Sequence, residues 1–199
     1  MPFDLDRFSA GDALATHCPS WEGRLVQVLS GYLDHLAILA HHPTTGRLCV
    51  YEAEFGEASC LITHKKRAGF RCRPLETWIR ANQSGGCEVW HVPLATPLPA
   101  YGQRALAKYL ARWCRDKIPY DLGGAIRART FGGRWATRGL IPCKQDASTL
   151  FCAEAVAVAW QELKLITIPN TAAYGPSGLV ALALKKGACL KPRLVEGAA

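Results

Sequence analysis

The sequence lacks the long hydrophobic segments that mark membrane proteins. No run of about 18 uncharged apolar residues occurs in its 199 residues. The first seven residues, Met1–Arg7, do not follow the basic-then-apolar order of a secretory signal. Internal repeats and low-complexity tracts are also missing. With 49% apolar residues, the chain is therefore expected to fold as one globular domain in the cytoplasm.

The nine cysteines form no recognisable metal or disulfide motif. Their number is odd and no two of them stand in a CxxC spacing, which excludes a zinc knuckle and argues against a disulfide framework. We therefore expect reduced thiols and no metal or other cofactor. The nine residues are Cys18, Cys49, Cys60, Cys72, Cys87, Cys114, Cys143, Cys152 and Cys189.

The formal net charge of +8 is spread along the chain instead of being concentrated in one tract. The densest basic groups are short, as in His64–Arg67, and no aromatic-interleaved RNA motif or recognition-helix pattern accompanies them. A solvated basic face is thus favoured over a nucleic-acid groove, although the charge leaves nucleic acid open as a partner.

Short strand patterns alternate with helical ones, which predicts an α+β domain built on a small antiparallel sheet with helices packed against it. Turn residues at Gly11-Asp12 lead into a first strand, and Tyr120–Cys143 is expected to be a long irregular segment. Further strands are expected at 35–40, 48–54, 57–64 and 87–94, and helices at 21–30, 74–80, 101–117, 176–184 and beyond Cys152.

Cys152 is placed where a thiol can become a nucleophile. Ser148 and Thr149 are typical residues at the start of a helix, and the run that follows has helical spacing without Pro or Gly. A thiol in the first helical turn lies at the positive end of the helix dipole, which favours the thiolate. The alternative is that Cys152 simply packs in the core, because free cysteines are often buried.

A thiolate hydrolase also needs a base and a group that orients that base. Among six histidines, His35 opens a strand and has acidic residues across the expected hairpin, whereas His91 lies within a strand and fits a structural role. A turn centred between Pro43 and Thr44 sets Glu52 opposite His35. A turn centred one residue later sets Glu54 there instead. Both glutamates share the face of His35, and both could alternatively serve as edge-strand charges.

The order of these features resembles the circularly permuted papain-fold cysteine hydrolases of the NlpC type, over nearly the whole chain (roughly residues 8–184). In that family the histidine strand precedes the cysteine helix. The matching stretches are Gly11-Asp12, Asp34–Ile38, Tyr51-Glu52-Ala53, Pro119-Tyr120-Asp121, Phe151–Glu154 and Pro176–Leu179. The family often has Ser, Ser and Asp where this chain has Asp34, Ala153 and Gly178, which bears on substrate choice.

The resemblance implies a thiol hydrolase of amide or peptide bonds in small or cell-wall-like peptides. Cys152 would be the nucleophile, His35 the base and Glu52 the residue that orients His35. The candidate substrate-binding residues are Tyr120, Tyr174 and Ser177, each of which also fits a core or capping role.

Two other functions are compatible with the same residues. One is an acyltransferase or lipid thioesterase that uses the same cysteine and histidine. The other is a binding or structural module in which Cys152 is catalytically idle. Selective thiol labelling of Cys152 that is lost in His35→Ala would support either enzyme and oppose the idle module.

Overall fold

The computed structural model describes residues 4–19, 32–125 and 148–196. Its centre is a six-stranded antiparallel sheet with the strand order β4-β3-β2-β1-β5-β6. The strands are β1 (Ala13–His17), β2 (His35–His41), β3 (Leu48–Ser59), β4 (Lys66–Pro74), β5 (Glu88–Val92) and β6 (Arg193–Leu194). The α-helices are α2 (Leu75–Ser84), α3 (Ala100–Asp116), α5 (Cys152–Glu162) and α6 (Pro176–Lys185), with short 3-10 turns η1 (Leu5–Arg7) and η3 (Thr171–Ala173).

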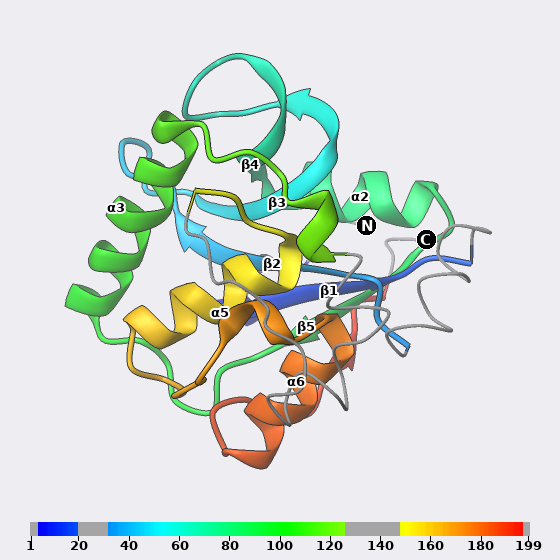
Figure 1. Cartoon of the computed structure of the whole chain (residues 1–199), viewed down its shortest axis with the longest axis vertical. Coiled ribbons are helices and arrows are strands. Elements are labelled where there is room, and N and C mark those ends of the chain that lie inside the picture. The colour runs from blue at the N-terminus through cyan, green and yellow to red at the C-terminus, as the bar shows by residue number, and fades with distance from the viewer. Residues whose placement is uncertain (1–3, 20–31, 126–147, 197–199) are drawn as a thin grey trace.

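Helices cover both faces of the sheet, so that the protein has two hydrophobic layers. Helices α3, α5 and α6 lie on the face toward the viewer in Figure 1, and α2 lies behind the sheet. Along β2, Leu36 and Ile38 pack under the first group, whereas Ala37 and Leu39 face α2. Such alternation is the period of two expected of a strand that is covered on both sides.

The expected α+β architecture and most of its elements are confirmed. The first strand follows the Gly11-Asp12 turn, and the hairpin of β2 and β3 is present. Helices α2, α3, α5 and α6 lie within a few residues of the expected ranges. The expected helix at 21–30 lies outside the described residues, and so does most of the irregular segment 120–143.

The expected strand at 57–64 is wrong. Residues up to Ser59 extend β3, residues 61–63 form a turn, and His64 adopts a left-handed conformation with φ 54°. The next strand is instead β4, in which four Lys and Arg residues interrupt the apolar alternation of Phe70 and Cys72. Arg67 binds backbone carbonyls, and Arg71 binds Glu52 and Glu54. The basic composition of this stretch therefore hides a strand that is partly buried.

The expectation that all cysteines are reduced is also wrong. Cys18, after β1, and Cys87, before β5, form a disulfide between neighbouring strands. The other described cysteines are free and buried, including Cys152. Disulfides persist mainly in oxidising compartments.

Within the described ranges, no helix is both long enough and apolar enough to span a membrane.

Candidate active site

Cys152 is the first residue of α5, as the sequence predicts. Phe151 is the N-cap residue and contributes no side-chain hydrogen bond, so Ser148 and Thr149 do not cap the helix. The first helical hydrogen bond runs from the Ala155 N–H to the Phe151 carbonyl at 2.9 Å. The backbone N–H groups of the first turn, including that of Cys152, thus form the positive end of the α5 dipole.

The chain before Cys152 is fixed by a short parallel bridge. The Leu150 N–H donates to the Pro119 carbonyl, the Asp121 N–H donates to the Leu150 carbonyl (both 3.1 Å), and Tyr120 pairs with Leu150. The segment carrying Tyr120 is itself held against β4. Cys152 is therefore positioned by contacts that reach back to the sheet.

A glycine makes that approach to β4 possible. The Phe70 N–H donates to the Ile118 carbonyl at 2.9 Å, next to Gly69. A Cβ atom at Gly69 would lie 2.5 Å from the Ile118 carbonyl oxygen, and the φ of Gly69 is +96°. Both the space and the backbone conformation require glycine here.

The body of α5 is anchored to the Gly11-Asp12 turn. Trp160 donates its indole N–H to the Gly11 carbonyl at 2.9 Å. Asp12 is buried and accepts hydrogen bonds from the Leu94 and Ser9 N–H groups, and its Oδ2 lies 2.8 Å from Nε2 of His91. The structural role expected for His91 is thus confirmed, and the turn serves the scaffold.

His35 opens β2 and lies against Glu52 of β3, with 3.0 Å between its Nε2 and Oε2 of the glutamate. The strand register pairs Ile38 with Tyr51, which is the hairpin centred between Thr44 and Thr45. Continued to the start of β2, this register sets Glu54 opposite His35. Nevertheless, Glu52, two residues away on the same face, makes the contact.

Glu52 is 1% exposed and is enclosed by donors. The Arg71 Nε–H donates to Oε1 at 3.0 Å, and the Trp78 indole N–H donates to Oε2 at 2.6 Å. Nη1 of Arg73 lies 3.7 Å from Oε1. Arg71 also binds Glu54, whose side chain is 45% exposed. Arg71 therefore ties Glu54 to the site without bringing it to His35.

Sequence reasoning missed Arg71, Arg73 and Trp78. Arg71 is paired directly with Glu52 in the register of β3 and β4, and Trp78 lies on α2. Two arginines at alternating positions are a signal for a face of β4 that binds carboxylates. That signal depends on recognising β4 as a strand, which its basic composition hides.

The electrostatics of Glu52 favour its ionised form. Burial alone raises its pKa, but hydrogen bonding to His35 and the charges of His35 and Arg71 outweigh burial and lower the pKa to about 2. Glu52 is therefore a carboxylate at neutral pH and stabilises a positive charge on His35.

His35 has the opposite shift. Burial alone lowers its pKa, whereas hydrogen bonds to Cys152 and Glu52 and the negative charges of both raise the pKa to about 10. Because Glu52 occupies Nε2, the remaining ring nitrogen, Nδ1, is the one left for the sulfur. A protonated His35 next to Cys152 favours the thiolate form of the cysteine.

Access to this pair differs between the two residues. Cys152 is 1% exposed, whereas the His35 side chain retains 18% exposure. Cys152, His35 and Glu52 together have the geometry of a nucleophile, its base and an orienting carboxylate.

The three candidate substrate-binding residues differ in their surroundings. Tyr120 bridges to Leu150, and its ring packs edge-on against Phe55 with 6.3 Å between centroids. Tyr174 follows η3 and packs against the apolar core. The Ser177 hydroxyl accepts the Leu33 N–H at 2.8 Å, so it ties α6 to the segment that enters β2. Tyr120 is the one placed beside the start of α5.

Asp34, where the resembled family often has Ser, also has a structural contact. Its carboxylate accepts the Thr16 hydroxyl at 2.7 Å and the Cys18 N–H at 2.6 Å. The residues on either side of His35 are therefore fixed, Asp34 by β1 and Leu36 by the core. This fixation holds the imidazole in place at the start of its strand.

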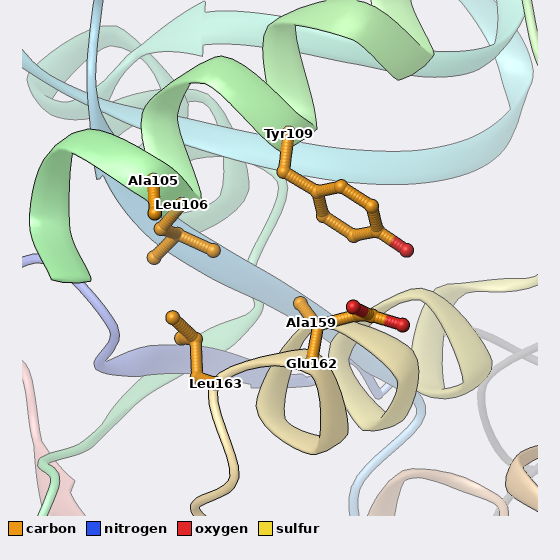
Figure 2. Close-up of a pocket in the computed structure, with 6 residues that line it drawn as sticks. All are labelled: Ala105, Leu106, Tyr109, Ala159, Glu162 and Leu163. Carbon is orange, nitrogen blue, oxygen red and sulfur yellow. The ribbon is translucent and has the colours of Figure 1, made fainter.

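A small pocket of about 150 Å³ lies elsewhere, between α3 and α5 (Figure 2). Tyr109 and Glu162 point to the same end of it, and burial together with the charge of Glu162 raises the pKa of Tyr109 to about 12. Glu162 is ten residues after Cys152, about 15 Å along the helix. This pocket is separate from the cysteine site.

Metal binding has no candidate cluster in the described parts of the chain. There, no three His, Cys, Asp or Glu side chains are arranged so that they could hold a metal ion.

Comparison with known proteins gives a likeness in fold. No family model and no curated protein matches the sequence. Among solved structures, the chain is similar to the metalloprotein yiiX (DUF1105) of Escherichia coli O157:H7. The TM-score is 0.50 at 18% sequence identity, and the match covers 78% of this chain and 66% of that one. At this identity the likeness concerns the fold alone, and this chain spans just under two thirds of that protein.

Proposed function

We propose that the protein is a cysteine hydrolase with a circularly permuted papain-like fold of the NlpC type, and that it cleaves an amide or peptide bond. The observation that supports this most is the contact of His35 with both Cys152 and Glu52. The strand carrying His35 precedes the helix carrying Cys152, which is the order expected of the permuted fold.

The reaction begins with the Cys152 thiolate. Its sulfur attacks the carbonyl carbon, and the backbone N–H of Cys152 at the start of α5 supplies part of the oxyanion hole. The tetrahedral intermediate collapses as the His35 imidazolium gives its proton to the leaving amine. The products of this step are a thioester on Cys152, a free amine and a neutral imidazole.

Water completes the cycle. Neutral His35 removes a proton from a water molecule, whose oxygen attacks the thioester carbonyl. The acid product leaves, and Cys152 returns as a thiolate facing a protonated His35. Glu52 remains ionised throughout and stabilises the imidazolium, because His35, and to a smaller degree Arg71 and Trp78, lower its pKa.

Small peptides, including cell-wall-like ones, are the proposed substrates on the basis of the family resemblance.

A second candidate function is that of an acyltransferase or thioesterase. Phe55 is 66% exposed and packs against Tyr120, which adjoins Leu150 just before the nucleophile. An apolar edge beside the sulfur would suit an acyl chain.

The cytoplasmic location expected from the sequence stays a prediction, and the disulfide argues for an oxidising environment.

Acyl trapping tests the proposal. The protein is mixed with fluorogenic peptide amides and, separately, with an acyl thioester, and intact mass spectrometry follows the adduct. We expect an acyl group on Cys152, released by water and absent in Cys152→Ala. Cys189→Ala, at another buried free thiol, is the matched control and should behave as wild type. Release only to an added acceptor would favour the acyltransferase, and turnover that survives in Cys152→Ala would exclude both enzymes.

A further inference from the structure

A second, larger pocket lies at the other end of the sheet. It has a volume of about 810 Å³, within the range of about 300–1,000 Å³ that small-molecule sites occupy. The turn between β2 and β3, the turn between β3 and β4, η1 and the start of α2 surround it. His41 lines it and is six residues after His35, about 20 Å along β2. The pocket is therefore distinct from the cysteine site.

The floor of this pocket is apolar. Phe8, Cys49 and Leu75 are each no more than 5% exposed, and all three line the pocket. The half-buried side chains of Leu48 and Leu61 add to the same surface. A surface of this kind binds an aliphatic chain through the hydrophobic effect.

The rim carries a guanidinium. Arg47 is exposed and makes no ion pair within the described residues. Its charge acts on Cys49 in the floor. A hydrogen bond with Cys72 lowers the pKa of the Cys49 thiol, burial raises it, and the Arg47 charge lowers it to a smaller degree, so that the net shift is downward. Arg47 and Cys49 thus line the same pocket.

His42 supplies a directed donor next to Arg47. Its Nδ1 accepts the Thr44 and Thr45 N–H groups at 3.3 and 3.2 Å. An acceptor at Nδ1 requires that the ring proton of the neutral imidazole be on Nε2. Within the described residues nothing accepts that Nε2–H. By contrast, His41 has both ring nitrogens engaged, with Gly46 and Gln103.

Two carboxylates also line the pocket and limit the charge of a ligand. Glu76 is bound by Arg80 on the same helix, at 2.8 and 3.1 Å. Asp6, on exposed η1, adds one negative charge at the rim. With Glu76 paired to Arg80, the charges of Arg47 and Asp6 cancel at the rim, so a monoanion meets less repulsion there than a doubly charged phosphate. The planar guanidinium fork of Arg47 matches a carboxylate.

We propose that this pocket binds a single-chain alkyl carboxylate. The alkyl chain lies along Phe8, Leu48, Leu61 and Leu75, and the carboxylate accepts hydrogen bonds from the Arg47 guanidinium and the His42 Nε2–H. This site is independent of the chemistry at Cys152, so Cys152→Ala retains it.

Calorimetric titration of the full chain with hexanoate, octanoate and decanoate tests the proposal. We expect one saturable site, with each added methylene tightening Kd about two- to fourfold. Decyltrimethylammonium, which has a similar chain and the opposite charge, should not bind. Equal binding of decanoate and the ammonium, or binding to phospholipid vesicles without binding of decanoate, would overturn the proposal.

Variants locate the site. Arg47→Gln should weaken decanoate binding about tenfold, because a charge-assisted hydrogen bond is lost. Arg115→Gln is the matched control and should leave Kd unchanged, because Arg115 is exposed on α3 and makes no ion pair with another described residue. Leu5→Asp, at a 39% exposed position on the pocket wall, should also weaken binding while the fold is retained. Identical Kd values for Arg47→Gln and Arg115→Gln would exclude this pocket as the binding site.

Discussion

Glu52 reaches His35 from a diagonal position on the neighbouring strand. The register of β2 and β3 sets Glu54, and not Glu52, directly across from His35. The contact of 3.0 Å is nevertheless made by Glu52, since diagonal neighbours on one face are within reach of a long side chain. Arg71 binds both glutamates and holds Glu54 away from the imidazole.

Glu52 and Glu54 should therefore differ in their contribution to stability. Glu52→Gln leaves the buried Arg71 without its 3.0 Å ion pair and should lower the free energy of unfolding by about 3–5 kcal/mol. Glu54→Gln, at a 45% exposed side chain, should cost at most about 1 kcal/mol. Urea denaturation measures both. Equal losses would contradict the assignment of Glu52 as the enclosed carboxylate.

The protonation of His35 should depend on Cys152. NMR titration of the imidazole should give a pKa of about 10 in the wild type. In Cys152→Ala the pKa should fall, because the hydrogen bond and negative charge of the sulfur are lost. An unchanged pKa in this variant would mean that the sulfur does not face the imidazole.

The raised pKa of His35 also has a consequence for stability. Proton binding is stronger in the folded state than in the unfolded one, where the pKa is about 6.5. The stabilisation is fully present below pH 6.5 and is lost as the pH rises through about 10. Glu52 acts in the acid range, where its stabilisation is lost as the pH falls from about 4.5 toward 2. Chemical denaturation at a series of pH values measures both losses.

Gly69 should be required for the position of Cys152. Gly69→Ala sets a Cβ 2.5 Å from the Ile118 carbonyl and displaces the segment that pairs with Leu150. We expect a loss of about 1–3 kcal/mol in stability and slower alkylation of Cys152. Gly46→Ala, at φ +69° with open space around it, is the control and should lose stability without slowing alkylation.

The disulfide should stabilise the fold appreciably. Cys18 and Cys87 are 69 residues apart, and in the chain-entropy model a loop of this length contributes about 4 kcal/mol. The double variant Cys18→Ser/Cys87→Ser should show a loss of this order in urea denaturation. Thiol titration of the unfolded, unreduced wild type should find two fewer thiols than after reduction. An equal thiol count before and after reduction would contradict the disulfide.

Local patterns in the sequence predict much of the fold and the candidate triad. Cys152 is recognisable because a helical run follows it, and His35 and Glu52 because strand alternation places them on one face. Three features required knowledge of the tertiary structure. The choice of Glu52 over Glu54 depends on Arg71 and Trp78, which come from β4 and α2. The disulfide depends on β1 and β5 being neighbours. The partner of Ser177 depends on α6 lying beside Leu33.

The pH dependence of Cys152 alkylation tests the central claim most directly. Iodoacetamide modification is followed by peptide mass spectrometry in the wild type and in His35→Gln. We expect Cys152 to react faster than the other described free cysteines, at a rate that stays high well below pH 8.5. In His35→Gln the alkylation rate of Cys152 should fall at neutral pH, and the rate should reach half of its maximum near pH 8.5, as for an ordinary thiol. A wild-type midpoint near 8.5 that His35→Gln leaves unchanged would contradict a thiolate stabilised by His35.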